Sequence, residues 1–147
     1  MESAATYTAV DRSIADRSSD VADLVGRIAL AAIFILAGAG KLFGHTAQTV
    51  QMMQAYGVPF AGLLVYCAGV IEMVGGLALA AGYRTRIAAI ALAAFTVLVT
   101  PIFHAFWAAP ADQAMNQMLF FSKNLAIVGG LLHVAALGTK RFALQRD

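Results

Sequence analysis

The sequence predicts an all-α integral membrane protein, built as a bundle of four transmembrane helices. Of its 147 residues, 61% are hydrophobic and 12% are charged. A soluble domain has about 45–50% apolar and about 25% charged residues, so a single soluble core could not bury this much apolar surface. The chain also contains four apolar stretches of about 20 residues, the length at which a helix crosses the roughly 30 Å hydrocarbon core of a bilayer.

The four predicted spans follow one another through short connectors. They cover residues 24–43, 61–81, 87–107 and 119–138. Residues 82–86 form a tight turn, so the second and third spans are expected to make an antiparallel hairpin. Residues 44–60 mix apolar side chains with glutamines and finish at Gly57 and Pro59, which predicts a short helix on the membrane surface.

The two ends of the chain are expected to lie outside the membrane. Residues 1–23 are polar and show no sustained periodicity, so we expect a mobile, disordered cytoplasmic tail. Residues 24–138 form the predicted membrane domain. Residues 139–147 form a short basic cytoplasmic tail.

The distribution of lysine and arginine predicts the orientation of the bundle. Eight basic residues lie on one side of the membrane, in the two tails, at the start of the first span and in the turn at residues 82–86. The connectors at residues 44–60 and 108–118 contain no lysine or arginine. Because basic residues are retained preferentially in the cytoplasm, both termini are expected to be cytoplasmic.

The composition argues against several functional classes. The formal net charge of +2 is too small and too scattered to indicate nucleic-acid binding. Cys67 is the single cysteine, so the chain can form neither an internal disulfide nor a CxxC redox or metal motif. His104 and His133 are predicted at different depths in the membrane, and His45 lies in a connector, so no metal site is predicted.

Glu72 is the residue that most strongly suggests a function. It is the twelfth of residues 61–81, a segment with no other charge, so the helix rise places its carboxylate near the middle of the membrane. A charge there costs roughly 3 kcal/mol on insertion scales, and such residues usually have a partner or a functional role. Ala68 and Gly76, one turn away on either side, leave room for a partner side chain.

Four further polar residues are predicted to lie above Glu72, toward the extracytoplasmic side. Lys41 closes the first span, and His104 lies near the end of the third. Lys123 and Asn124 begin the fourth span. We expect Glu72 to pair with Lys123, with Lys41 or with both, because a lysine stem reaches several ångströms. His104 and Asn124 would complete the hydrogen bonds, so these five residues form the predicted ligand pocket.

The third span carries a polar stripe. Thr96, Thr100 and His104 follow one another at i, i+4 spacing and therefore share one face of the helix. Pro101 interrupts this stripe and is expected to kink the helix, because it leaves the Val97 carbonyl without its helical hydrogen bond.

Other interpretations of the charged residues stay open. Lys41 could be an edge lysine that reaches the lipid headgroups. Glu72 could serve as a structural link between helices, or it could be neutral and take part in a proton-linked step or a hydrogen bond to a ligand.

Several short motifs follow one another in a specific order and spacing. They are Arg27, Gly-Ala-Gly-Lys at 38–41, Gly-Val-Pro at 57–59, Glu-Met-Val-Gly-Gly at 72–76, Gly-Tyr-Arg-Thr-Arg at 82–86, Phe-His-Ala-Phe-Trp at 103–107 and the segment 123–132 that begins Lys-Asn. Over about residues 24–138, the sequence thereby resembles the DoxX family of small bacterial four-helix membrane proteins. The resemblance selects the same five residues as the predicted pocket, namely Lys41, Glu72, His104, Lys123 and Asn124.

The resemblance implies a general role rather than a reaction. Members of the family include a subunit of a thiosulfate:quinone oxidoreductase and proteins linked to oxidative stress or sulfur metabolism. We therefore expect a multi-pass protein of the bacterial inner membrane that is a membrane subunit of a redox partner rather than a stand-alone enzyme. A quinone is the candidate ligand. The alternatives are a carrier of a small solute or proton, which would require a homo-oligomer, and a non-catalytic assembly protein.

Overall fold

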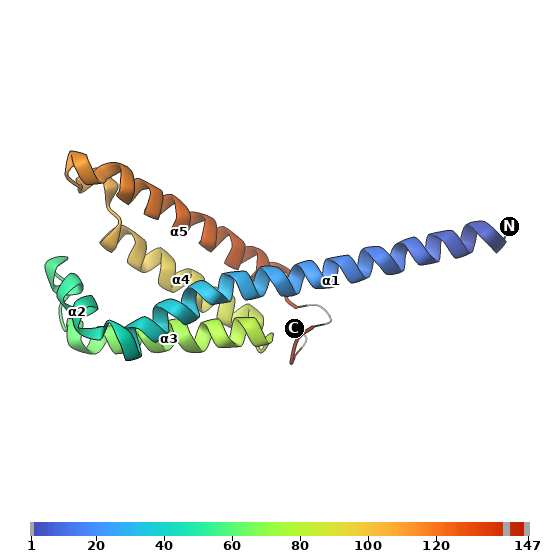
Figure 1. Ribbon diagram of the computed structural model, residues 1–147, viewed down its shortest axis with the longest axis horizontal. Helices are drawn as coiled ribbons and strands as arrows, with labels where there is room; N and C mark the ends of the chain where they lie inside the picture. Colours follow the sequence, from blue (N-terminus) through green and yellow to red (C-terminus); the bar gives the residue numbers. More distant parts are fainter. Residues whose placement is uncertain (1, 140–141, 146–147) are drawn as a thin grey trace.

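The computed structural model describes residues 2–139 and 142–145, with side chains from residue 16 onward. The described chain is helical and contains no strand. Figure 1 shows its five α-helices, whose bounds are α1 Glu2–Ala39, α2 Thr46–Ala55, α3 Ala61–Ala81, α4 Thr85–Phe103 and α5 Ala111–Leu137. A π-helical turn, Gly40–Gly44, extends α1, and a 3₁₀ turn, Phe106–Ala108, lies between α4 and α5.

The prediction of an all-α bundle with four spans is confirmed. Four helical segments are long and apolar enough to cross a membrane, namely Asp16–Gly44, Ala61–Ala81, Thr85–Ala108 and Ala111–Leu137. The fourth helix begins eight residues before the predicted start at residue 119, because Pro110 occupies its N-cap and polar residues continue the same helix. A short helix, as expected within residues 44–60, is present as α2, and its place on the membrane surface stays a prediction.

The two predicted tails differ in their placement. Residues 2–23 form the first part of α1, which projects well beyond the bundle in Figure 1, although the sequence shows no sustained periodicity there. The mobility expected for residues 1–23 stays a prediction. Of the predicted basic tail, residues 142–145 pack on the bundle, and residues 140–141 and 146–147 lie outside the described residues.

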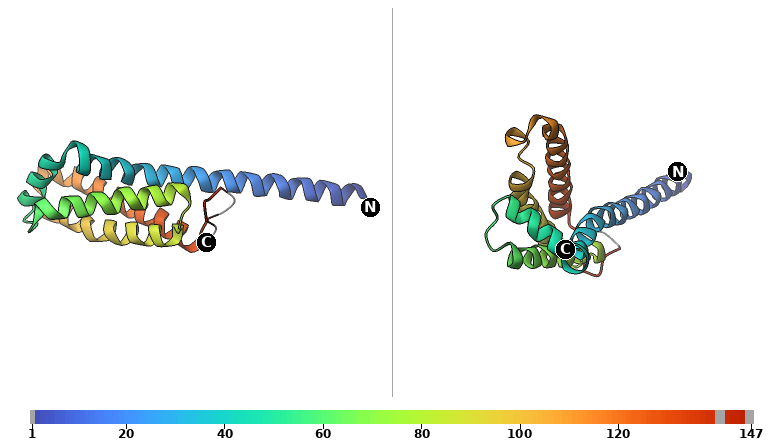
Figure 2. Two further views of the ribbon diagram at one scale, coloured as in Figure 1. Left: turned by 90° about the horizontal axis from the view of Figure 1, so that it is seen from below. Right: turned by 60° about the vertical axis from the view of Figure 1, so that its left-hand side comes forward.

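The bundle consists of two closely packed helix pairs. α1 packs mainly on α3, and α4 packs mainly on α5, while the α3–α4 contact joins the two pairs. The C-terminal end of α5 lies near α1, and α5 diverges from α1 toward the end of the bundle where α2 lies (Figures 1 and 2). The helices of the two pairs therefore lie further apart toward the end where α2 lies (Figures 1 and 2).

Apolar side chains lie both inside the bundle and on its outer surface. Leu79, Leu92 and Leu131 are fully buried in the core. Leu36 and Leu98 are 73% and 66% exposed on the outside of their helices. A membrane accommodates such faces because lipid tails are as apolar as leucine, and the helices must then be held together by close packing and polar contacts.

Arg27 links three segments at the end of the bundle where the termini lie. Its side chain is fully buried and forms an ion pair of 3.1 Å with Asp23, one turn earlier on α1. Its Nη1 donates hydrogen bonds to the carbonyls of Leu79 and Ala80, at 3.0 and 3.3 Å. Its Nη2 donates to the carbonyl of Phe142. A cation is well placed here, because the last carbonyls of α3 lack helical partners and carry partial negative charge.

The C-terminal segment at residues 142–145 lies across the turn between α3 and α4. The backbone N–H groups of Leu144 and Gln145 donate to the carbonyls of Ala81 and Gly82, both at 3.0 Å. Gly82 has a φ of 68°, and a Cβ built on it would lie 2.5 Å from the docked segment. The turn therefore requires glycine for both its backbone conformation and its packing.

Replacing Arg27 by alanine is expected to destabilise the protein strongly. The change removes one partner of Asp23 and leaves the α3 carbonyls without their cation, and breaking a buried ion pair in this way typically costs about 3–5 kcal/mol. Thermal unfolding in detergent should then shift down by on the order of 10 °C. Arg17→Ala, at an exposed position on the same helix, is the matched control and should unfold close to wild type. Equal melting temperatures for the two variants would contradict the assignment.

Candidate functional site

Lys41 and Glu72 form an ion pair between the first and third helical segments. Nζ of Lys41 donates a hydrogen bond of 2.7 Å to Oε2 of Glu72. The Glu72 side chain is 9% exposed, and the Lys41 side chain is 22% exposed. Of the two partners that the sequence left open for Glu72, the structure pairs it with Lys41.

The ion pair lies at the closest contact between α1 and α3, where glycines take the place of side chains. A Cβ at Gly38 would lie 2.7 Å from the carbonyl oxygen of Gly69, and one at Gly69 would lie 3.2 Å from the Lys41 Cβ. One turn further, a Cβ at Gly76 would lie 3.1 Å from the Ala31 carbonyl oxygen. The absence of side chains lets the two backbones approach closely, as small residues do in membrane helices.

A π-helical turn presents Lys41 to α3. Gly40–Gly44 continues α1 with a wider turn, in which the His45 N–H donates to the Gly40 carbonyl at 2.6 Å. The Thr46 hydroxyl donates to the Lys41 carbonyl at 2.5 Å, which joins this turn to the start of α2. Single π-turns within helices are rare and often occur at functional sites.

The ion pair retains unused hydrogen-bonding capacity. Within the described part of the chain, Oε1 of Glu72 has no hydrogen-bond partner, and Nζ of Lys41 donates to Glu72 alone. An ammonium group has three N–H donors, and a carboxylate has two acceptor oxygens. The unpaired atoms of the pair could therefore hydrogen-bond a ligand that offers both an acceptor and a donor.

The two threonine hydroxyls of the polar stripe predicted on α4 form hydrogen bonds within α4 itself. The hydroxyls of Thr96 and Thr100 are buried and donate to the carbonyls one turn earlier, at 2.8 and 2.6 Å. α4 ends at Phe103, and the His104 N–H donates to the Thr100 carbonyl. Nδ1 of His104 lies 2.9 Å from Oε1 of Gln117 on α5. His104 therefore links α4 to α5.

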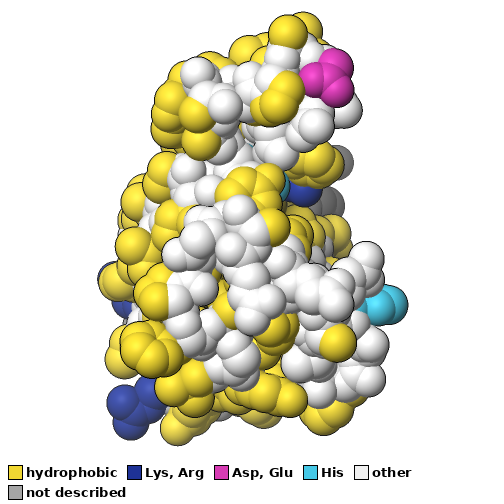
Figure 3. Space-filling model, turned by 90° about the vertical axis from the view of Figure 1, so that its left-hand side faces the viewer, with side chains coloured by type: hydrophobic (Ala, Val, Ile, Leu, Met, Phe, Trp, Pro, Cys, Tyr) yellow, Lys and Arg dark blue, Asp and Glu magenta, His cyan; other side chains and the backbone are white. Residues whose placement is uncertain are grey.

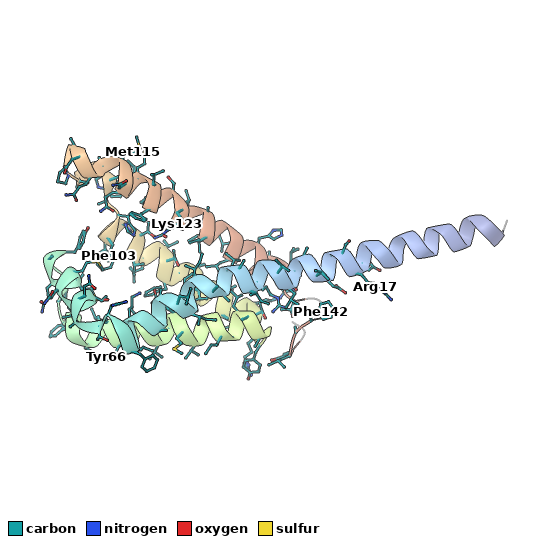
Figure 4. All side chains as sticks on the ribbon, in the orientation of Figure 1. Arg17, Tyr66, Phe103, Met115, Lys123 and Phe142 are labelled. Carbon is teal, nitrogen blue, oxygen red and sulfur yellow. The ribbon has the colours of Figure 1, made fainter. Side chains whose placement is uncertain are left out.

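Lys123 and Asn124 also belong to the α4–α5 pair. Nδ2 of Asn124 donates to the Thr100 hydroxyl at 3.0 Å. Lys123 is exposed, and its Nζ lies 4.8 Å from the centre of the Phe120 ring, which is within the range of a cation–π contact. Figure 4 shows Lys123 on α5, well away from α3.

The five residues of the predicted pocket are thus held in two groups. Lys41 and Glu72 bond to each other between α1 and α3. His104 and Asn124 bond to residues of α4 and α5 instead of Glu72, and Lys123 contacts Phe120. The role of all five residues in binding a ligand stays a prediction.

Two features of the site were not recognised from the sequence. The residue that packs against the Lys41 stem is Gly69, whereas the spacing argument selected its neighbour Ala68. Arg27 was used only for orientation and for the family resemblance, although it is the most completely buried charge in the described chain. Its i, i+4 spacing from Asp23 at the start of an apolar segment was the available signal.

The chain is similar to known membrane proteins over most of its length. The model of the DoxX family matches residues 22–105. The inner membrane protein YqjF of Escherichia coli (strain K12) is 39% identical over 127 residues, which cover 86% of this chain and 92% of the relative. The inner membrane protein YphA of the same organism is 32% identical over 123 residues, which cover 84% and 87% of the two chains. No solved structure matches the chain.

Gly38→Ala is expected to separate α1 from α3 and weaken the ion pair. The added Cβ would lie 2.7 Å from two backbone atoms of α3, so the helices must shift apart. Overpacking of this kind costs about 1–3 kcal/mol, which thermal unfolding in detergent would detect. Gly62→Ala is the matched control, because nothing lies within 4 Å of a Cβ at that position. A Gly38→Ala protein as stable as the control would show that the contact is looser than described.

Proposed function

We propose that this chain, which belongs to the DoxX family of integral membrane proteins, is a membrane subunit that works with a redox partner and presents a quinone to the Lys41–Glu72 pair. The observation that carries this proposal is the unused hydrogen-bonding capacity of a buried ion pair in an apolar bundle. The family resemblance supports the redox partner. The partial exposure of Lys41 offers access to the pair.

The chemistry of the pair matches the needs of a quinone. A quinone carbonyl accepts hydrogen bonds, which the free N–H groups of Lys41 would donate. The hydroxyl of the reduced form donates a hydrogen bond, which Oε1 of Glu72 would accept. Reduction adds two electrons and two protons to the ring, so the redox partner would supply the electrons. The pair would orient the ring oxygens and help to hold the protons.

Replacing both members of the pair should separate a functional role from a structural one. The double variant Lys41→Met, Glu72→Leu removes both charges, and such a replacement is often neutral for stability. We expect it to unfold near the wild-type temperature, and we expect native mass spectrometry to find no quinone on it, whereas the wild type carries one. Asp112→Asn, which removes a charge at an exposed position of α5, is the control and should keep the quinone.

The proposal fails if the wild type purifies without quinone and Glu72→Gln leaves every redox phenotype unchanged. If the ion pair served only to stabilise the fold, the variant would give a different result. In that case Glu72→Gln lowers the melting temperature, because the partly buried Lys41 loses its charged partner, and the function of the partner protein is intact. This outcome would support the non-catalytic assembly protein.

A carrier of a proton or small solute is the second candidate function. A single buried carboxylate with one free oxygen, halfway along a span, is the observation that favours it. Four helices are few for a solute pathway, so this function would require a homo-oligomer. Flux into proteoliposomes that is absent, or that is the same for Glu72→Ala, would exclude it.

We also propose that both termini face the cytoplasm of a bacterial cell. Arg84, at the N-cap of α4, and Arg86, in its first turn, lie at the end of the bundle where the C-terminal segment docks. The opposite end, viewed in Figure 3, carries mostly hydrophobic and neutral groups with few charged side chains. An excess of basic residues on the terminal side supports its retention in the cytoplasm.

Cysteine labelling of intact cells tests this orientation. In a Cys67→Ser background, we expect a membrane-impermeant maleimide to label a cysteine at Gln48 on α2. The same reagent should leave a cysteine at Tyr83, in the α3–α4 turn, unlabelled until the cells are opened. Both positions are exposed on the protein, so the difference reports the side of the membrane. The reverse labelling pattern would place the termini outside.

A further inference from the structure

The C-terminal segment is fixed to the bundle through its backbone. The Phe142 carbonyl accepts a hydrogen bond from Arg27. The N–H groups of Leu144 and Gln145 donate to carbonyls at the end of α3, both at 3.0 Å, and the Gln145 carbonyl accepts from the Thr139 hydroxyl at 3.1 Å. These four hydrogen bonds hold the segment in place and involve none of its side chains.

The side chains of the segment differ in their surroundings. Ala143 faces the α3–α4 turn, because its Cβ lies 2.5 Å from the position of a Cβ built on Gly82. The two larger neighbours lie on the outside: Phe142, labelled in Figure 4, is 46% exposed and Leu144 is 78% exposed. Tyr83, in the adjoining turn, is also exposed. The segment therefore presents large apolar side chains away from the bundle.

This apolar surface lies at the level where the membrane is expected to end. α3 has 21 residues, and a helix of this length spans about 30 Å, the thickness of the hydrocarbon core. The segment bonds to Ala81, the last residue of α3, and to Gly82 just beyond it. Its outward side chains therefore meet the boundary between the acyl chains and the headgroups, where residues such as tyrosine are enriched.

Exposed cations lie at the same end of the bundle. Arg84 is exposed, and its guanidinium carbon lies 6.0 Å from the centre of the Tyr83 ring. Within the described part of the chain, Arg84 forms no ion pair. Arg86, in the first turn of α4, is exposed as well. In the sequence, Lys140 and Arg141 directly precede the segment. Positive charge and outward apolar side chains are thus combined on one surface.

We propose that this surface binds the headgroups of anionic phospholipids. The lipid phosphate would accept hydrogen bonds from the Arg84 guanidinium, while the acyl chains cover Phe142 and Leu144. Each basic residue near the surface favours a negatively charged membrane about fivefold. A zwitterionic lipid offers the same acyl chains without net charge, so the surface selects the anionic lipid. The surface is separate from the Lys41–Glu72 pair, and the inference does not depend on the ligand of that pair.

The position of the single tryptophan allows a direct test. Trp107 lies beyond the C-terminal end of α4, at the opposite end of the bundle from the C-terminal segment. The variant Trp107→Phe, Phe142→Trp moves it to an exposed position of that segment. We would reconstitute the full chain into phosphatidylcholine vesicles that contain a small, equal share of either phosphatidylglycerol or phosphatidylcholine brominated on the acyl chains. Bromine quenches tryptophan on contact.

We expect the brominated phosphatidylglycerol to quench the relocated tryptophan more strongly than the brominated phosphatidylcholine. High salt should reduce this preference, because it screens exposed charges. Trp107 of the unaltered protein is the control and should show little preference, because the connectors at its end of the bundle contain no lysine or arginine.

Matched variants locate the charge that selects the lipid. In the relocated-tryptophan protein, Arg84→Gln should lower the preference about fivefold. Arg17→Gln removes an exposed charge about 15 Å beyond Arg27 along α1 and should leave the preference unchanged. Leu144→Trp, with Phe142 retained and Trp107→Phe, places the tryptophan at the second exposed position and should show the same preference.

Three results would overturn the inference. The first is equal quenching by the two brominated lipids at both exposed positions, which would show contact with acyl chains without recognition of charge. The second is no quenching by either lipid at these positions, which would place the segment outside the membrane. The third is an equal effect of Arg84→Gln and Arg17→Gln, because the preference would then follow the net charge of the protein instead of this surface.

Discussion

The close approach of α1 and α3 is the contact on which the arrangement of charges depends. Lipid offers helices no hydrophobic gain on association, so packing and polar contacts must hold them together. Gly38 and Gly69 remove the side chains that would keep the backbones apart, and Lys41 can then reach Glu72 at 2.7 Å. The pair in turn opposes separation of the helices, because each charge would be left alone in an apolar medium.

The division of the bundle into two helix pairs gives the protein two chemical environments. Between α1 and α3 lies a charged pair, reached through a π-helical turn. Between α4 and α5 lies an apolar groove, formed beside Pro101 in the last turn of α4, where the 3₁₀ turn brings Trp107 beside Phe121. The charged pair and the apolar groove therefore belong to different helix pairs.

The hydropathy of the sequence predicted the fold well, because a bundle of transmembrane helices depends on the length and composition of each span. It placed the second span at the residues of α3. The energetic cost of a charge within the membrane, together with its expected depth, selected Glu72 and Lys41, which form an ion pair in the structure. The same reasoning grouped Lys123 and Asn124 with Glu72, because it estimated depth along each helix but not the rotation of one helix against another. That rotation follows from contacts such as Asn124 with Thr100, which one sequence does not reveal.

The docking of the C-terminal segment has a consequence for biosynthesis. Arg27 is made 115 residues before Phe142, and the two can meet only after all four spans have been made. Domains generally fold from the N-terminus during synthesis, yet here the first helix enters the membrane before one acceptor of its buried arginine exists. The carbonyls of Ala81 and Gly82, at the end of α3, likewise accept their hydrogen bonds from Leu144 and Gln145 only after those residues have been made. The end of the bundle where these segments meet is therefore completed only after residues 142–145 have left the ribosome.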